Sequence, residues 1–126
     1  MLIFLLTMRV ISKLVPIVFI LGSAIAFPNQ VHARCGEASY YGPGLYYGQT
    51  ANGETFLPGT MTAAHPYLPF GAWVKVTNQR NGRSVSVRVN DRGPYVSGRI
   101  IDLSKAAAAK LGMLASGVAD VCISRI

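Results

Sequence analysis

The stretch RSVSVRVNDRGPYVSGRIID (residues 83–102) decides the fold of this chain. Valines at every second position from 85 to 89 alternate with polar residues, so this run predicts a β-strand with one buried and one wetter face. The pair Gly93-Pro94 then predicts a turn, and the following RIID predicts a short buried strand. Asp91 and Asp102, two of the five acidic residues of the chain, therefore end two predicted strands.

Turn residues divide the neighbouring sequence into further short strands. Strand-like runs begin at residue 36 and lie at 60–65, 73–78 and 117–126. Asn81-Gly82 gives the hairpin signal between 73–78 and the valine run. One short helix is predicted from Ser104, a suitable cap, to Gly112, a suitable left-handed stop. Many short strands with one small helix predict a compact β-barrel.

Residues 1–33 have the layout of a secretory signal peptide. Arg9 and Lys13 precede an apolar run over 14–27, and Val31 and Ala33 suit a cleavage site after Ala33. A membrane anchor is the less favoured alternative, because the run is shorter than the roughly twenty residues that span a bilayer. We therefore predict export to the periplasm or extracellular space, a mature domain over 34–126, and no membrane attachment after cleavage. Translation can start at Met1 or at Met8.

Cys35 and Cys122 are the two cysteines of the chain. An even count in a short exported chain predicts a disulfide, because the export compartment is oxidising. The bridge would tie together both ends of the mature domain, and closing so long a loop contributes about 4 to 5 kcal/mol in the chain-entropy model. No lipid anchor is expected on Cys35, since Arg34 stands where a lipobox has a small residue.

The predicted mature chain is basic and has room for one domain. Two of the twelve Lys and Arg residues fall in the signal peptide, which leaves ten against five Asp and Glu. Nucleic acid is not expected as a partner outside the cytoplasm. An anionic wall polymer, attracted by long-range steering, is the favoured partner, and a charge that serves only solubility is the alternative.

The residues of the mature domain that can carry chemistry are few: Glu37, Glu54, His65, Asp91, Asp102 and Asp120. One histidine with scattered carboxylates has neither the spacing of a zinc site nor a Ser-His-Asp pattern. We therefore expect no metal and no cofactor. What remains is acid/base chemistry by carboxylates and histidine.

Four motifs resemble the rare lipoprotein A family over about residues 37–126: ASYYG (38–42), TANGE (50–54), TAAH-x-x-LPFG (62–71), and NDRGP (90–94) with IIDLS (100–104). Members of this family are endolytic peptidoglycan transglycosylases built on a double-psi β-barrel, a barrel that also resembles expansins and barwin-like endoglucanases. The resemblance implies a six-stranded double-psi barrel with one short helix.

The resemblance also implies four catalytic residues, namely Glu54, His65, Asp91 and Asp102. Asp102 is similar to the aspartate of the expansin HFDLS motif. The chain departs from the family pattern at Leu57, where many members carry an aspartate.

A lytic transglycosylase needs one carboxyl group that protonates the glycosidic oxygen and then accepts the proton of the C6 hydroxyl as an anhydro ring closes. The pKa of that acid must be raised by burial or by a nearby negative charge. Asp91 is the first choice for this acid/base, with Glu54 and His65 shaping or sharing the proton chemistry.

Each of the four residues also has a structural alternative. Asp91 can pair with Arg92 or Arg99, and Asp102 can accept from free N–H groups at the helix start. His65 can be a buried core histidine, and Glu54 a solvated loop charge.

Aromatic residues suggest where a glycan binds, because sugar rings pack their C–H faces on aromatic rings. The predicted substrate-binding residues are Tyr41, Tyr46, Tyr47, Tyr95 and Arg92. Tyr40 and Phe70 are expected in the barrel core, and Trp73 is expected to pack rather than bind ligand.

Together these observations predict an exported enzyme that cleaves the MurNAc–GlcNAc bond of peptidoglycan and leaves anhydromuramyl ends, in wall remodelling or septum processing. The family resemblance suggests a preference for glycan without stem peptides. One alternative is a non-catalytic, expansin-like wall-binding module. The other is an inverting hydrolase, which needs two carboxyl groups about 6.5 to 9.5 Å apart.

Overall fold

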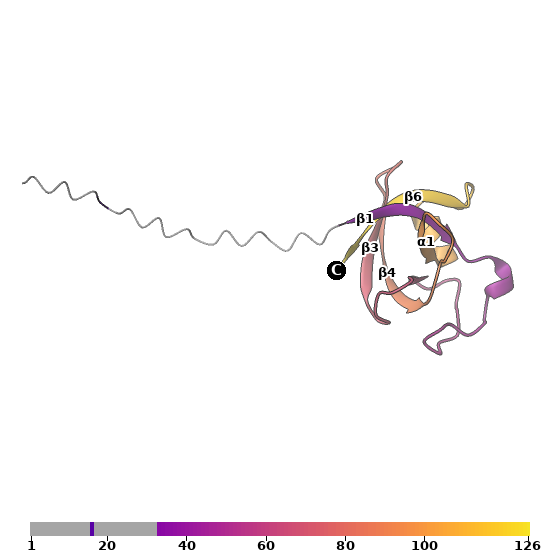
Figure 1. The fold of residues 1–126 in the computed structure, drawn as a ribbon. Coiled ribbons are helices and arrows are strands. Elements are labelled where there is room, and N and C mark those ends of the chain that lie inside the picture. The colour runs from indigo at the N-terminus through magenta and orange to yellow at the C-terminus, as the bar shows by residue number, and fades with distance from the viewer. Residues whose placement is uncertain (1–15, 17–32) are drawn as a thin grey trace, which may run out of the picture.

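The computed structural model describes Pro16 and residues 33–126. The predicted signal peptide lies outside the described residues except for Pro16 and Ala33. The elements in chain order (Figure 1) are β1 (Arg34–Tyr40), the 3-10 helix η1 (Pro43–Leu45), β2 (Thr62–Ala64), β3 (Trp73–Asn78), β4 (Ser84–Asp91), β5 (Arg99–Leu103), α1 (Lys105–Lys110) and β6 (Val118–Arg125). Over this part of the chain, no helix is both long and apolar enough to cross a membrane.

The six strands close into a barrel in the order β1-β5-β2-β4-β3-β6. The pairs β1–β5 and β2–β4 are parallel, and the other pairs are antiparallel. The predicted mainly-β fold with one short helix is therefore confirmed. The predicted hairpin between β3 and β4 is present as well, with Gly82 at a φ of 75°.

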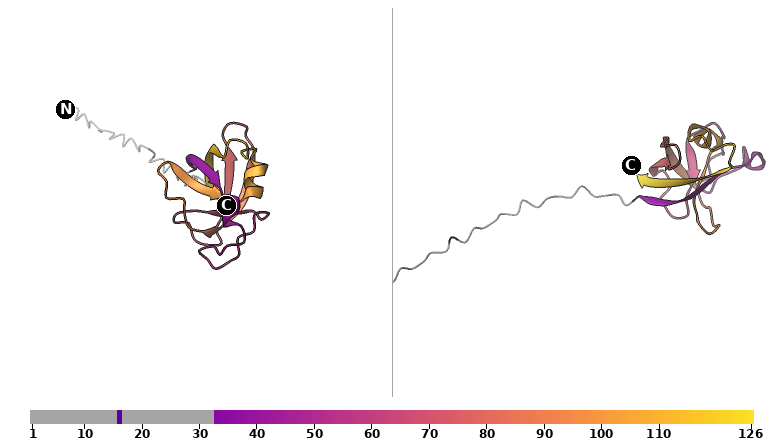
Figure 2. Two further views of the ribbon diagram at one scale, coloured as in Figure 1. Left: turned by 90° about the vertical axis from the view of Figure 1, so that its right-hand side faces the viewer. Right: turned by 90° about the horizontal axis from the view of Figure 1, so that it is seen from above.

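Alternating apolar residues of the strands fill the barrel. Those with no exposed surface include Val74, Val76, Val87, Ile101, Leu103 and Val121. Ser104 accepts a hydrogen bond from Ala107 N at the start of α1, and Gly112 follows the helix with a φ of 71°, as predicted. Ala107 and Ala108 join the core, and α1 lies against the strands (Figure 2).

Two aromatic residues predicted to pack are instead exposed. Phe70 is 42% exposed because it lies in the loop before β3, where its ring faces the Arg92 guanidinium. Trp73 is 46% exposed because Val74 and Val76 take the inward positions of β3 and leave Trp73 on the outer face. Tyr40 packs against the core as predicted, and its hydroxyl donates to the carbonyl of Leu114.

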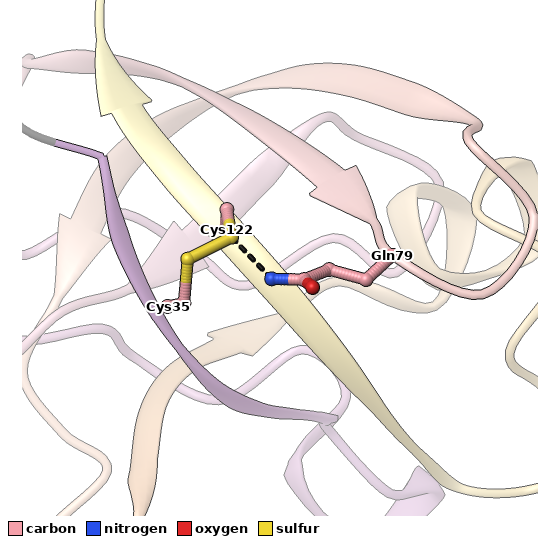
Figure 3. Close-up of a disulfide and its surroundings, with 3 residues drawn as sticks. All are labelled: Cys35, Gln79 and Cys122. Atoms are coloured by element: carbon pink, nitrogen blue, oxygen red, sulfur yellow. Dashed lines mark hydrogen bonds between the residues drawn. A yellow bond between two sulfur atoms is a disulfide. The ribbon is translucent and has the colours of Figure 1, made fainter.

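The predicted disulfide joins Cys35 of β1 to Cys122 of β6 (Figure 3). The two residues face each other directly in the antiparallel pair of β1 and β6. The Gln79 side chain, from the end of β3, donates to Cys122 Sγ. The bridge therefore fastens the first and last strands of the barrel.

Candidate active site

Asp91 and Asp102 lie on either side of Ala64 in the sheet. Ala64 is opposite Asp91 in the β2–β4 pair and opposite Asp102 in the β2–β5 pair. Residues directly opposite each other share a face of the sheet, so both carboxylates lie on the face that carries Ala64. With β2 between them, their backbones are separated by two strand spacings, or about 10 Å. Two predicted catalytic residues are therefore brought together.

A shift of register puts Asp91 on this face. Val89 is opposite Ala63, yet the next pair joins Ala64 to Asp91 and passes over Asn90. Strict alternation would have placed Asp91 on the inner face with Val87 and Val89. One extra residue in a strand reverses the direction of the following side chains.

The carboxylate of Asp91 accepts three hydrogen bonds. Tyr41 Oη donates to Oδ2 at 2.5 Å, and the backbone N–H groups of Ala51 and Arg92 donate to Oδ1 at 2.9 Å each. The predicted alternative, an ion pair of Asp91 with Arg92 or Arg99, is not found. Arg99 pairs with Glu37, and the guanidinium of Arg92 donates to backbone carbonyls instead. These donors fix the orientation of the carboxylate.

Asp102 has fewer donors and is half-buried. Ser39 Oγ, opposite it on β1, donates to Oδ1 at 3.2 Å. Burial raises the pKa of Asp102 and the charge of Asp91 adds to the increase, while Ser39 and Arg99 oppose it. The helix cap is Ser104 rather than Asp102, so the predicted capping alternative is wrong.

Glu54 is held as a carboxylate. The guanidinium of Arg88 donates to both of its oxygens at 2.7 and 2.8 Å, and the side-chain amides of Asn52 and Asn90 donate at 2.9 and 3.2 Å. The hydrogen bond with Arg88, followed by those with Asn52 and Asn90, lowers the pKa of Glu54 to about 2. Near neutral pH Glu54 therefore has no proton to donate.

The contacts of Glu54 fasten the loop before β2 to β4. Asn52 N donates to the carbonyl of Asn90, and Thr50 N donates to the carbonyl of Glu54. Ala51 lies between these anchored residues, and its N–H reaches Asp91. Glu54 thus contributes to the site by positioning a donor to Asp91.

His65 is 2% exposed and follows Ala64 at the end of β2. Its Nδ1 accepts from the backbone N–H groups of Tyr67 and Leu68, so the ring proton belongs on Nε2. Burial, and after it the charges of Arg34 and Arg92, lower the pKa of His65 to about 4. The imidazole is therefore neutral near pH 7, and among the described residues its hydrogen bonds are to backbone rather than to Asp91 or Asp102.

Arg92, predicted to bind substrate, is engaged within the protein. Its guanidinium donates to the carbonyls of Leu68 and His65 at 2.8 and 3.3 Å and stacks on Phe70, 3.9 Å from the ring centroid. These contacts hold the loop that follows β2. A direct contact of Arg92 with substrate stays a prediction.

The four predicted substrate-binding tyrosines differ in exposure. Tyr47 and Tyr95 are 72% and 79% exposed and are open to a ligand. Tyr46 packs against Phe56, and Tyr41 is buried beside Phe56 with its hydroxyl on Asp91. Tyr41 therefore acts on Asp91, a contact that the sequence did not predict.

Ser39 and Arg88, which contact Asp102 and Glu54 respectively, were not among the predicted site residues. Ser39 lies in the ASYYG motif, and this motif could have identified it as a site residue. Nothing near Arg88 in the sequence connects it to Glu54. Across residues 33–126, no three His, Cys, Asp or Glu side chains are grouped to hold a metal.

Comparison with known proteins identifies the family to which the chain belongs. Residues 33–123 match the family model described as lytic transglycolase. The chain is 58% identical over 88 residues to the probable endolytic peptidoglycan transglycosylase RlpA of Synechocystis sp., covering 70% of this chain and 27% of that protein. It is 50% identical over 100 residues to the endolytic peptidoglycan transglycosylase RlpA of Neisseria meningitidis, covering 78% and 42%. The chain thus spans less than half the length of these relatives.

Solved structures share the barrel. Streptomyces papain inhibitor superposes with a TM-score of 0.61 at 29% identity, over 75% of this chain and 94% of the inhibitor. The expansin of Clavibacter michiganensis superposes with a TM-score of 0.59 at 22% identity, over 75% and 50%. These likenesses support the double-psi barrel, a fold on which function depends on the site. On the match of the family model and the identity to curated relatives, the chain belongs to the rare lipoprotein A family of lytic transglycolases.

Proposed function

We propose that this chain is an endolytic peptidoglycan transglycosylase. The observation that supports the proposal most is the pair Asp91 and Asp102 on one face of the sheet, in a chain of the lytic transglycolase family. The relatives named as transglycosylases are longer, so their activity comes to this chain as an inference. We further propose export with cleavage after Ala33, which the disulfide supports because such bonds persist in oxidising compartments.

The proton chemistry is assigned to Asp102. Burial and the charge of Asp91 favour its protonated form, as a general acid requires. Protonated Asp102 donates to the glycosidic oxygen as the MurNAc–GlcNAc bond breaks, and its carboxylate then accepts the C6 hydroxyl proton as that oxygen bonds to C1. Asp91, oriented by its three donors, supplies negative charge beside the oxocarbenium-like transition state. Asp91 as the acid, the first choice from sequence, is the competing assignment.

The test incubates the exported and processed protein with purified sacculi and with stem-less glycan, and analyses the products by mass spectrometry. We expect anhydromuramyl ends, with Asp102→Asn lowering the rate about 10²-fold or more, as loss of a general acid does. Asp120→Asn is the matched control, since Asp120 is exposed on β6. Reducing ends in place of anhydromuramyl ends would instead identify a hydrolase.

A substrate with a nitrophenyl leaving group separates the two carboxylates, because such a group departs without a proton. Release of nitrophenolate is measured, because this step precedes ring closure, in which Asp102 acts as the base. Asp102→Asn should release nitrophenolate at a rate close to that of the unchanged protein, and Asp91→Asn should not. The opposite pattern would return the role of acid to Asp91.

A non-catalytic wall-binding module is the second candidate, and Leu57 favours it. Leu57 is 45% exposed at the position where the family resemblance predicts an aspartate. Binding to sacculi without formation of any cleavage product would support this candidate against the transglycosylase.

A further inference from the structure

A cavity of about 140 Å³ opens at the end of the barrel where β6 finishes and β1 and β3 begin. Its walls include Arg34, Arg125, Tyr67, Leu68, Val74 and Ile123, with His65 beside them. Arg34 is opposite Ile123, and Arg125 is opposite Val74, in the sheet. Since Ile123 and Val74 belong to the core, both arginine side chains start on the inward side of their strands.

The two arginines that line the cavity lack acidic partners within residues 33–126. The ion pairs of this part of the chain are Arg88–Glu54 and Arg99–Glu37. The Arg34 guanidinium lies instead over the Tyr67 ring, 5.1 Å from its centroid. The cavity therefore presents two guanidinium groups, which are the preferred protein partners of a carboxylate.

The remaining walls of the cavity limit the kind of anion that it can bind. Leu68, Val74 and Ile123 are apolar, so the cavity combines a cationic rim with a hydrocarbon surface. A carboxylate attached to a small alkyl group satisfies both. In a peptidoglycan strand, the D-lactyl ether of MurNAc has these two parts, a methyl group and a carboxylate, when no stem peptide is attached. A stem peptide converts the carboxylate to an amide and removes the charge.

We propose that Arg34 and Arg125 form a subsite for the free lactyl carboxylate of MurNAc and so select glycan without stem peptides. The inference rests on the proposed function and names residues that would determine its specificity. His65 connects the cavity to the strand that separates the two carboxylates: it lines the cavity and follows Ala64, and its backbone N–H donates to the backbone carbonyl of Asp91 at 3.2 Å. A strand across Asp91 and Asp102 can thus place a lactyl group at the end of the barrel.

Binding of small probes tests the subsite without any catalysis. The exported and processed protein is titrated with N-acetylmuramic acid, its lactyl N-methylamide, N-acetylglucosamine, and N-acetyl-D-alanyl-D-alanine, followed by NMR. We expect N-acetylmuramic acid to bind at least tenfold more tightly than the other three and to shift the signals of Tyr67 and Ile123. Equal affinity for the acid and its methylamide would overturn the proposal, and tighter binding of the dipeptide would assign the cavity to a stem-peptide carboxylate instead.

Variants test the arginines themselves. Arg34→Gln and Arg125→Gln, alone and together, should remove the preference for the acid over its methylamide, while Arg80→Gln on the exposed β3–β4 turn should retain it. With glycan, the double variant should raise KM for stem-less strands and leave kcat nearly unchanged. If both probes lost affinity in parallel while circular dichroism showed a native fold, the arginines would not distinguish the acid from its methylamide, and the subsite would be overturned.

The outcomes separate this inference from the proposed function. If no anhydromuramyl product forms but N-acetylmuramic acid still binds through the arginines, the proposed subsite is supported and the proposed transglycosylase activity is refuted. If products form at equal rates from stem-less and amidated strands, the proposed transglycosylase activity is supported and the proposed subsite is refuted.

Discussion

The hydroxyl of Tyr41 donates a 2.5 Å hydrogen bond to Asp91 Oδ2, which joins the residue after β1 to the last residue of β4. Tyr41 is buried against Phe56, with ring centroids 4.5 Å apart. Burial and the bond to Asp91 raise the pKa of the Tyr41 hydroxyl, so it remains a donor at any pH where the protein would work.

Tyr41→Phe should weaken the site while keeping the ring packing. Loss of a hydrogen bond to a charged group should reduce the free energy of unfolding by about 1.5 to 3 kcal/mol. The rate on stem-less glycan should fall mainly through kcat, because Asp91 loses a donor that orients it. Tyr40→Phe is the control, since its hydroxyl bonds to Leu114 away from the carboxylates. Equal kcat values for the two variants would exclude a role of Tyr41 in orienting Asp91.

Glu54 should make stability depend on acid pH. Its pKa falls from 4.5 to about 2 on folding, so its contribution is fully present above pH 4.5 and is lost as the pH falls towards 2. In urea denaturation between pH 2 and 6, the unchanged protein should lose more stability on acidification than Glu54→Gln. Arg88→Gln should also flatten the profile, because Arg88 is the main cause of the low pKa. Identical slopes for the three proteins would contradict this.

His65 should stay neutral well below its ordinary pKa. Its pKa of about 4 in the folded chain lies under the usual 6.5, so between these values the unfolded chain binds a proton that the folded chain does not. The free energy of unfolding should therefore fall as the pH is lowered from 6.5 to 4. An NMR titration of the imidazole gives the pKa directly, and a midpoint near 6.5 would refute the expectation.

Removal of the disulfide should destabilise the barrel without altering the site. The Cys35–Cys122 bridge closes a loop over a sequence separation of 87. Replacing both cysteines by serine should lower the free energy of unfolding by about 2 to 5 kcal/mol. Reduced protein measured in dithiothreitol should show the same loss, and a stability unaffected by either treatment would show that the bridge contributes nothing.

Leu57→Asp introduces an acid at the position where the family resemblance predicts an aspartate. Leu57 is exposed, so the free energy of unfolding should change by no more than about 0.5 kcal/mol. We expect the transglycosylase rate to rise, with Leu57→Asn as the uncharged control. An unchanged rate would show that this position does not limit catalysis.

Local sequence patterns were sufficient to predict much of the fold and to identify the candidate residues. The valine alternation of β4, the Asn81-Gly82 turn and the Ser104 cap each act over a few residues, so the sequence displays them directly. The motifs likewise pointed to Asp91 and Asp102. The roles of Tyr41 and Arg88 were not visible, because their partners lie 50 and 34 residues away in the chain.

The sequence by itself determined the strands, the helix α1, the cysteine pair and the two candidate carboxylates. Only the tertiary structure decided where the carboxylates point. Alternation along β4 assigns Asp91 to the buried face of Val87 and Val89, and the register shift at Asn90 turns it to the face of Asp102. Strand register arises from pairing between distant segments, which no local pattern specifies.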